Sequence, residues 1–418
     1  MNIKFLDLFA GAGGLSEGFI QTGYSPVAHV EMDKGACFTL KTRLAYHWLK
    51  SQNKAKDYQS YLSGTICRDE LYSKIPSSVI DSVLNEEISD ESLPRIFNKV
   101  DSVLQGEKLD LIIGGPPCQA YSVVGRSRDK NGMKGDKRNY LYKFYAEFLN
   151  KYQPSYFVFE NVLGLLSAKD QDGELYFDKM TQVFKENGYL TEYRTIDSSD
   201  YGIPQARKRI ILVGKLKGSE GFYPELEKSS EKIAVHEILK DLPKLSAGEG
   251  HHGFQQINKV HSNSYLFQSG IRLPKNNYVT WHQARPHIER DLNIYRIAVE
   301  QWDKEKKRLN YNDLPSELKT HNNRKSFLDR FKVVTKEGPS HTVVAHISKD
   351  GHYYIHPDAE QNRSLTVREA ARIQTFPDDF YFESHSGKPS RTAAFKQIGN
   401  AVPVLLAKQI ALQIKPNF

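Results

Sequence analysis

The sequence is poor in cysteine and has no long hydrophobic run. Only three of its 418 residues are cysteines, Cys37, Cys67 and Cys118, and their spacing matches no metal-binding pattern. Three thiols cannot form a disulfide framework, so we expect a reducing, cytoplasmic location. No apolar run approaches the length of a membrane span, and the chain passes from Met1 directly into a predicted strand. We therefore expect neither a membrane anchor nor a signal peptide.

Charge and composition set weaker limits. Charged residues make up 26% of the chain and hydrophobic residues 39%, which is ordinary for a globular protein. The net charge of +8 permits an anionic partner such as nucleic acid without requiring one. The length predicts about two to three domains.

The first 30 residues predict a strand, a glycine-rich turn, a helix and a second strand. Residues 3–9 are apolar, Ala-Gly-Ala-Gly-Gly follows at 10–14, and Leu15, Phe19 and Ile20 then recur at helical spacing. Glycines allow close approach of a ligand, and a helix N-terminus favours negative charge. This order is typical of a nucleotide-binding βαβ unit, although the loop alone also occurs in plain tight turns.

The second predicted strand, residues 25–30, is followed by Glu31 and Met32. An acidic residue about 20 positions beyond a glycine-rich turn is placed to hold ribose hydroxyls. A solvated acidic turn is the alternative, and the glycine-rich loop favours the ribose role. Residues 34–50 predict a helix. Residues 51–108 are polar and predict a surface insertion, within which residues 64–66 would end a short third strand.

The most informative stretch is Gly-Gly-Pro-Pro-Cys-Gln at 114–119. An apolar run, residues 109–113, leads into it and predicts a buried strand. Two prolines fix φ at successive positions, so Cys118 is expected at the tip of a rigid turn. A buried, inert cysteine is the common alternative. The stiff turn and the polar residues after it favour a nucleophile.

Three further strands are predicted at residues 156–159, 190–196 and 210–213, with a helix over 139–152 before them. The first of these strands ends in Glu160. Ligands bind at the carboxyl ends of strands in open α/β sheets, so Glu160 is a second candidate reactive group. Arg207 and Arg209 are two residues apart, before and on a strand, and are expected to share one face.

These stretches resemble the motifs of DNA cytosine-5 methyltransferases, in family order and across nearly the whole chain. The matching segments are Phe-Ala-Gly-x-Gly-Gly at 9–14, Pro-Cys-Gln at 117–119, Glu-Asn-Val at 160–162, Gln-x-Arg-x-Arg at 205–209, the stretch 363–377, and Gln-Ile-Gly-Asn-Ala-Val-Pro at 397–403. The resemblance implies an α/β fold: a Rossmann-like S-adenosylmethionine-dependent methyltransferase sheet with helices on both faces, plus a smaller target-recognition domain. It implies a catalytic and cofactor-binding domain at 1–217, with 390–418 folding back onto it, and a target-recognition domain and hinge at 218–389.

The chemistry of the residues fits this resemblance. C5 of cytosine is a poor nucleophile, and addition of the Cys118 thiolate to C6 would make it enamine-like. Glu160 would supply a proton or hydrogen bond at N3. The resemblance places Arg209 near the base O2 and Arg207 in support of the active-site loop. S-adenosyl-L-methionine would supply the methyl group to a cytosine flipped out of double-stranded DNA.

The resemblance also implies the cofactor pocket, position by position. Phe9 and Met32 would flank the adenine and Glu31 would bind the ribose. The predicted cofactor-binding residues are Phe9, Gly11, Ala12, Gly13, Gly14, Glu31, Met32, Ile66, Pro117, Leu141, Asn400 and Ala401. The family often has an aromatic residue at the position of Met32 and usually an acid at that of Thr65. No metal is expected.

Residues 218–362 carry many Arg, Lys, Asn, Tyr and His residues but no catalytic pattern. Without cysteines, these histidines do not predict a zinc site. A charged helix is expected over 279–308. Base-edge readout needs such polar side chains on loops, so this region is the predicted reader of double-stranded DNA. A cognate restriction endonuclease acting on the same site is the other expected partner.

Three other functions stay open: an RNA cytosine-5 methyltransferase, a catalytically inactive DNA-binding relative, and a nicotinamide oxidoreductase. A recognition region as long as 218–362 favours duplex reading. The presence of Cys118, Glu160, Arg207 and Arg209 argues against an inactive relative. The glycine-rich loop alone would permit a nicotinamide enzyme, but such an enzyme needs neither Cys118 nor Arg209.

Overall fold

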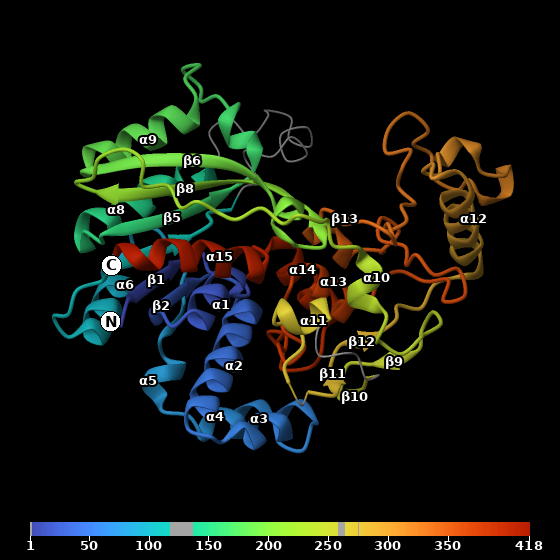
Figure 1. The fold of residues 1–418 in the computed structure, drawn as a ribbon, viewed down its shortest axis with the longest axis horizontal. Coiled ribbons are helices and arrows are strands. Elements are labelled where there is room, and N and C mark those ends of the chain that lie inside the picture. The colour runs from blue at the N-terminus through green and yellow to red at the C-terminus, as the bar shows by residue number, and fades with distance from the viewer. Residues whose placement is uncertain (1, 118–136, 258–263, 275) are drawn as a thin grey trace.

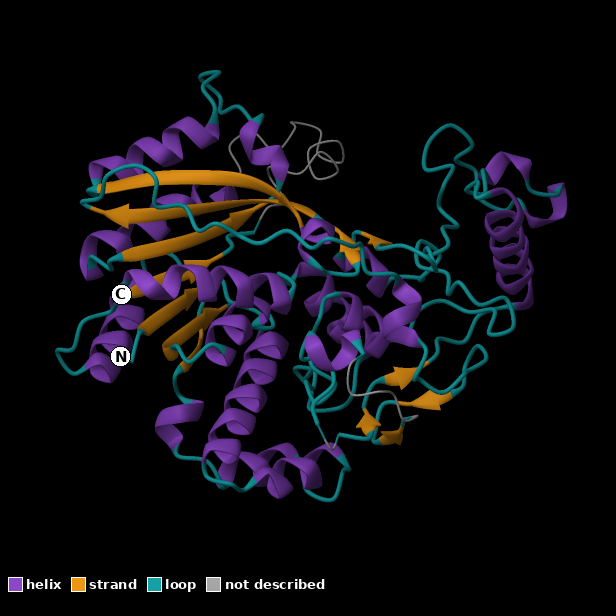
Figure 2. Cartoon of the chain, viewed as in Figure 1, coloured by secondary structure: helices purple, strands orange, loops and turns teal. Residues whose placement is uncertain are grey.

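The computed structural model describes residues 2–117, 137–257, 264–274 and 276–418. Its centre is a seven-stranded sheet of order β3-β2-β1-β4-β5-β8-β6 (Figures 1 and 2). Strand β8 is antiparallel to both its neighbours, and the other adjacent pairs are parallel. The strands are β1 (Lys4–Leu8), β2 (Ser25–Glu31), β3 (Val83–Asn85), β4 (Leu111–Gly114), β5 (Tyr156–Asn161), β6 (Tyr189–Asp197) and β8 (Lys208–Leu216).

Helices cover both faces of this sheet because its side chains alternate between two apolar layers. In β1, Leu6 and Leu8 join one buried cluster, whereas Phe5 joins the other. The first cluster includes residues of α6 (Leu93–Leu104), α8 (Leu141–Tyr152) and α9 (Tyr176–Glu186). The second includes residues of α1 (Gly14–Gln21) and α15 (Val404–Ile414). The predicted α/β class, with helices on both faces, is confirmed.

The C-terminal helix lies against the first helix of the chain. Tyr24 donates a hydrogen bond through its hydroxyl to the carbonyl oxygen of Ala411, at 2.9 Å. At Gly18 the two helices approach so closely that a Cβ atom would lie 2.4 Å from the backbone nitrogen of Lys408. The glycine is therefore required by packing rather than by its backbone angles.

The third strand is not where the sequence predicted it. It is β3, residues 83–85, and residues 64–66 lie instead in a turn between two helices. The insertion predicted at residues 51–108 is therefore shorter than expected, because β3 is a strand of the central sheet and α6 packs on one face of that sheet. The helices before β3 are α2 (Lys34–Ser51), α3 (Ala55–Leu62), α4 (Arg68–Ser73) and α5 (Ser77–Ile80).

The second half of the chain has little regular structure and two apolar cores of its own. The larger core contains α10 (Val235–Leu239), α13 (Val367–Ile373) and α14 (Arg391–Asn400), and it reaches Ala12 in the glycine-rich loop. Its strands have two residues each: β7 (Gln205–Ala206), β9 (Gly250–His251), β10 (Gln255–Gln256), β11 (Tyr278–Val279), β12 (His282–Gln283) and β13 (Ser340–His341). The short helix α11 (Tyr265–Gln268) packs at its edge. The domain boundaries at 217 and 389 stay a prediction.

The smaller core surrounds α12 (Glu289–Glu305), which stands at the far end of the molecule from the sheet (Figure 1). The helix expected over 279–308 was therefore too long at its start, where β11 and β12 lie. Seven 3₁₀ turns complete the described structure: η1 (Lys137–Tyr140), η2 (Leu163–Leu166), η3 (Ser198–Tyr201), η4 (Tyr311–Asp313), η5 (Ser316–Leu318), η6 (Ala345–Ser348) and η7 (Lys415–Asn417).

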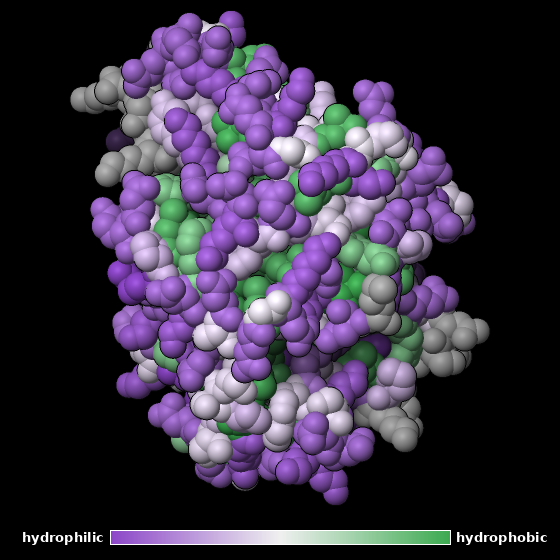
Figure 3. Space-filling model, turned by 90° about the vertical axis from the view of Figure 1, so that its left-hand side faces the viewer, coloured by the Kyte–Doolittle hydropathy of each residue, from purple (hydrophilic) through white to green (hydrophobic). Residues whose placement is uncertain are grey.

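The surface is mostly hydrophilic on the face drawn in Figure 3, where hydrophobic residues form small separate groups. Within the described part of the chain, no helix combines the length and apolar character needed to cross a membrane.

Candidate active site

The ends of β4 and β5 bring the predicted catalytic segments together. Gly114 pairs with Phe159, so the residues that follow them, Gly115 and Glu160, lie side by side. A Cβ atom on Gly115 would be 2.9 Å from Oε2 of Glu160. Asn161 donates a hydrogen bond through Nδ2 to the carbonyl oxygen of Pro116, at 3.4 Å. The turn that leads to residue 118 is thus anchored on the strand that carries Glu160.

Cys118 itself lies outside the described residues, so its side chain has no described position. Its neighbour Pro117 is described and half-buried. The other two cysteines are poor nucleophile candidates. Cys37 is buried in α2, where burial raises the pKa of its thiol to about 12. Cys67 is exposed and precedes α4 in the insertion.

Glu160 is almost completely buried and is paired with a cation. The Nε atom of Arg209 lies 2.9 Å from Oε1 of Glu160, and both side chains are mostly shielded from solvent. This contact crosses from β8 to β5, which are hydrogen-bonded in antiparallel register. The sheet therefore places a permanent guanidinium charge directly beside the carboxylate.

Arg207 has different partners from Arg209. The strand is interrupted at Arg207, between β7 and β8. Its Nη1 donates to the carbonyl oxygens of Val343 and Gly399, at 2.9 and 3.4 Å. Gln205 reinforces this joint, since its Oε1 accepts a hydrogen bond from the Val343 amide at 2.8 Å. The two arginines were expected to share one face, but Arg207 lies at the junction with the second half of the chain and Arg209 lies at Glu160.

The glycine-rich loop is held against the end of β2 by Glu31. Its carboxylate accepts hydrogen bonds from the amides of Gly11 at 2.8 Å and Asp33 at 2.7 Å. Burial raises the pKa of Glu31, and these two amide bonds oppose the rise. Met32 next to it is 58% exposed, which is unusual for such a large apolar side chain. A carboxylate beside an apolar surface suits a ribose joined to an adenine.

The backbone of this loop leaves room for a ligand at one point and is closely packed at others. Phe9 has φ of +57° and Gly11 has φ of +56°. A Cβ on Gly11 would meet nothing within 4 Å. At Gly14, by contrast, a Cβ would lie 3.1 Å from the Cβ of Ala401 and 2.4 Å from the carbonyl oxygen of Val402. The C-terminal segment therefore forms one wall of the predicted cofactor site.

The remaining predicted cofactor residues divide into two groups. Leu141 begins α8, which follows β4, and Asn400 ends α14 immediately before Ala401. Gly13, with φ of +81°, caps α1. Ile66 is different. It packs in the apolar cluster of α3 and α4, because the strand that it was expected to end does not exist.

Sequence reasoning missed Asn85 at the true end of β3. Its Nδ2 donates to the carbonyl oxygens of Glu31 and Met32, at 3.2 and 2.9 Å. The amide of Glu86 also donates to the Glu31 carbonyl, at 3.1 Å. A strand of three residues gives no periodic signal, so only the pairing with β2 reveals it.

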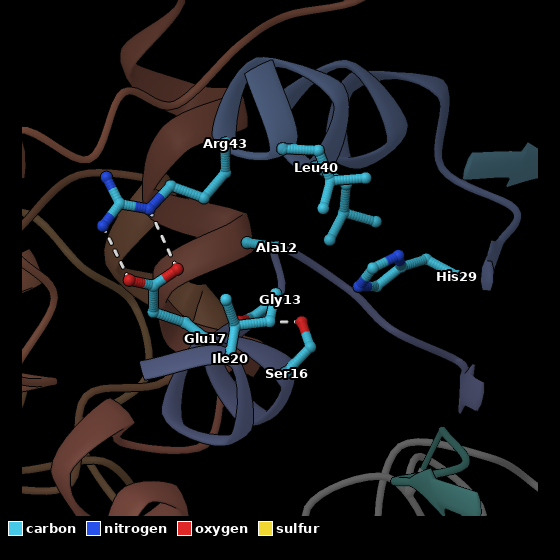
Figure 4. A pocket seen from close by; sticks show the side chains of 9 residues that line it. Ala12, Gly13, Ser16, Glu17, Ile20, His29, Leu40 and Arg43 are labelled. Carbon is cyan, nitrogen blue, oxygen red and sulfur yellow. Dashed lines mark hydrogen bonds and ion pairs between the residues drawn. The ribbon is translucent and has the colours of Figure 1, made fainter. Parts of the chain in front are cut away.

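A buried ion network lies behind the loop and ties together α1, α2 and the segment after α13. Figure 4 shows its Arg43–Glu17 pair. Arg43 forms two bonds to Glu17, at 2.6 and 2.9 Å, and a third to Asp379 at 2.9 Å. His47 also contacts Glu17, at 2.9 Å. Burial opposes ionisation of Glu17, but the charges of Arg43 and His47 hold its pKa well below the ordinary value. The network fixes α1, the helix that follows the glycine-rich loop, against the second half of the chain.

The fold and the carboxyl ends of β1, β2, β4 and β5 are those of an α/β enzyme. At these strand ends the predicted nucleotide-type cofactor site lies next to a buried carboxylate–arginine pair. Comparison with known proteins gives the family. The family model for C-5 cytosine-specific DNA methylases matches residues 3–63 and 86–416. The uncovered stretch, 64–85, lies mostly within the helical insertion. The chain belongs to the C-5 cytosine-specific DNA methylase family.

Relatives extend over the full chain. The type II methyltransferase M.Bpa9945I of Bacillus paralicheniformis is 41% identical and covers 98% of both chains. M.DdeI of Desulfomicrobium norvegicum is 30% identical and covers 100% of this chain and 89% of its own. A crystal structure of a putative DNA modification methyltransferase encoded within an E. coli prophage shares the fold, with a TM-score of 0.64 at 22% identity over 99% of both chains.

This protein is therefore a DNA (cytosine-5)-methyltransferase of the type II kind, which transfers a methyl group to C5 of cytosine in DNA. The family implies S-adenosylmethionine as the methyl donor. The family match favours DNA over the RNA and nicotinamide alternatives.

Proposed function

We propose that the pair formed by Glu160 and Arg209 holds a flipped-out cytosine for attack by Cys118. The single observation that carries this proposal is the anchoring of the 114–117 turn on the strand that carries Glu160. Residue 118 follows Pro117 directly in the sequence. Of the three thiols, only Cys118 directly follows the 114–117 turn at the end of β4.

In the proposed reaction the Cys118 thiolate adds to C6 of the cytosine. The electron pair moves to C5, and Glu160 supplies the hydrogen bond or proton at N3 that stabilises the negative charge. Arg209 orients Glu160 and can reach the base O2. After methylation, loss of the C5 proton expels the thiolate and restores the ring. The duplex must release the base, because C6 is unreachable within the stack.

S-adenosyl-L-methionine fits the carboxyl edge of β1 and β2, and it supplies an electrophilic methyl group when bound. Glu31 would accept the ribose hydroxyls, and Phe9 with Met32 would flank the adenine. Gly11 leaves open space for the amino-acid portion. The residues after β3 would take the place in the pocket that was expected of Ile66. Ile88 is buried in the cluster against which Phe9 packs.

We further propose that Arg207 positions the recognition half rather than the base, through Val343 and Gly399. Double-stranded DNA is the proposed substrate, with methylation at one sequence in the cytoplasm. The names of the relatives suggest a restriction–modification setting, so a cognate endonuclease acting on the same site is the proposed partner.

The test is bisulfite sequencing of DNA from a host that expresses the protein. We expect methylated cytosines within one short sequence, and none when the host expresses Cys118→Ala. The variant should bind S-adenosylmethionine with unchanged affinity in calorimetry. Methylation by Cys118→Ala near the wild-type level would exclude the covalent mechanism.

A further inference from the structure

We propose that the loop at residues 319–332 is a DNA-contacting element in which Phe327 packs its ring against an exposed base or sugar and Lys325 contacts a phosphate. This inference rests on the proposed function, because it assigns part of the DNA-binding surface to named residues. It concerns the lobe around α12, which stands apart from the sheet (Figure 1).

The loop is built on a buried tyrosine and ordered by its own backbone. Tyr311 is 1% exposed, its amide donates to the carbonyl oxygen of Leu328 at 2.7 Å, and its hydroxyl accepts a hydrogen bond from the amide of His321 at 2.8 Å. Asn323 accepts hydrogen bonds from the amides of residues 325 and 326, at 3.1 and 3.0 Å. A loop anchored in this way loses little conformational entropy on binding.

Two arginines hold the carbonyl groups of the loop. Arg330 donates to the carbonyl oxygens of Asn323, Ser326 and Phe327, at 2.7, 3.1 and 2.9 Å. The central carbon of its guanidinium lies over the Tyr311 ring, 4.2 Å from the centroid. Arg324 donates to two further carbonyls, of His321 and Lys319, each at 3.0 Å. Both arginines thus hold the backbone of the loop in place, and neither pairs with a carboxylate among the described residues.

Phe327 is presented to solvent in a strained conformation. Its side chain is 62% exposed, more than any other large hydrophobic residue in the described part of the chain. Its φ is +55°, in the left-handed region that a bulky residue rarely adopts. Such strain persists only where the surrounding structure imposes it, and it is concentrated at functional sites. The loop therefore holds an apolar ring outward at a cost in stability.

The charge around this ring fits a polyanion. Residues 319–332 contain five Lys or Arg residues against one acid, Asp329, so fourteen residues carry half of the net charge of +8. Among the ion pairs between described residues, none involves Lys319, Arg324, Lys325 or Arg330. An aromatic ring beside cations that pair with no carboxylate is the combination that binds nucleic acid, because the cations meet phosphates and the ring meets a base.

The experiment uses the full-length protein and a duplex that carries the sequence identified by bisulfite sequencing. Phe327→Ala should weaken binding of this duplex about 5- to 150-fold, as expected for loss of one base–aromatic contact. Lys325→Ala should lower the slope of log affinity against log salt by about one. Affinity for S-adenosylmethionine should not change in either variant.

Two substitutions at the sheet end of the molecule serve as matched controls. Leu412→Ala removes an apolar side chain that is 48% exposed on α15, and Lys99→Ala removes an exposed charge from α6. Both should leave affinity and salt slope unchanged. A photoreactive benzophenone side chain at position 327 should cross-link to the duplex, which a purely structural role would not produce.

The outcomes separate the two proposals. If the wild-type protein methylates no DNA, the proposed function fails. If the wild-type protein is active but Phe327→Ala binds the duplex within twofold of it and position 327 gives no cross-link, the loop assignment is overturned. Should Phe327→Ala fold poorly, the cross-linking measurement still decides the question.

Discussion

The sheet half of this methyltransferase (residues 2–217 with 390–418) and the proposed recognition half (residues 218–389) are held together by different means. In the sheet half, the strands interleave apolar side chains between two helical layers. In the recognition half, buried arginines add polar contacts to two apolar cores. Arg368 has 0% exposure and donates only to oxygen atoms of neutral groups, at Thr280, Pro377 and Phe380. Arg372 instead pairs with Asp241 and Asp378.

This difference suits the two proposed tasks, catalysis in the sheet half and DNA reading in the recognition half. The proposed catalytic pair needs fixed geometry, and Glu160 and Arg209 both belong to long strands of one sheet. A reader of DNA needs variable loops, which carry many backbone groups that no helix or strand satisfies. Buried guanidinium groups satisfy several carbonyl oxygens each, so they allow an irregular chain to form a core.

The largest effect is expected where the sheet half carries the chemistry. Glu160→Gln keeps the shape of the side chain but removes its acid. We expect kcat to fall by about 10²–10⁴, the usual contribution of general acid–base catalysis. The exposed Glu147→Gln on α8 is the matched control and should retain full activity. An unchanged kcat with a raised KM would instead show that Glu160 only positions the base.

The ion network between the halves should contribute mainly to stability. Glu17→Gln removes one carboxylate from buried Arg43 and leaves Asp379 in place. We expect the free energy of unfolding in urea to fall by about 3 kcal/mol, the lower end of the range for a broken buried pair. Because the pKa of Glu17 is lowered in the fold, its contribution is present above the ordinary value of 4.5 and is lost on acidification. An unfolding free energy within 0.5 kcal/mol of the wild type, about the noise of surface changes, would contradict this role.

A smaller loss should follow from overpacking the sheet half. Gly18→Ala forces a methyl group into the backbone of α15, and overpacking of this kind costs about 1–3 kcal/mol. Gly253→Ala is the control in the recognition half, since its new Cβ would meet only the His251 ring, at 3.4 Å. Thermal unfolding of both variants measures the difference. If Gly18→Ala and Gly253→Ala had equal melting temperatures, α1 and α15 could separate slightly without loss of stability.

The smallest effect concerns mild acid, which should loosen the recognition half first. Burial lowers the pKa of His287 and His356 to about 4, so both stay neutral in the fold while the unfolded chain takes up protons below about 6.5. The stability that they contribute is complete above this value and declines as pH falls towards 4. Among the histidines that the structure describes, seven of the recognition half have lowered pKa values, against His29 alone in the sheet half. The seven are His252, His282, His287, His321, His341, His352 and His356.

Hydrogen exchange at pH 7 and pH 5 measures this effect. Amides of the 278–283 and 352–356 segments should lose protection at pH 5 before those of β1, β4 and β5 do. Simultaneous loss in both halves would show that they unfold as one unit.

Local patterns predicted much of the sheet half correctly. The runs at β1, β2, β4, β5 and β8 are apolar and bounded by glycine, proline or polar residues, so each is recognisable without its neighbours. The order of the catalytic motifs along the chain gave the family. The recognition half was harder, because two-residue strands have no periodicity and the start of α12 is not marked by a side-chain cap.

The sequence by itself determined the reaction, because the residues predicted to perform it stand in short contiguous motifs whose spacing is set by single strands and turns. Tertiary structure alone decided where β3 pairs, which separated the third strand from Ile66, and which partner each arginine of the 205–209 motif has. Arg207 meets Val343 and Gly399, more than 130 residues away along the chain. Contacts over such separations depend on how whole layers pack, and no local pattern of side chains records them.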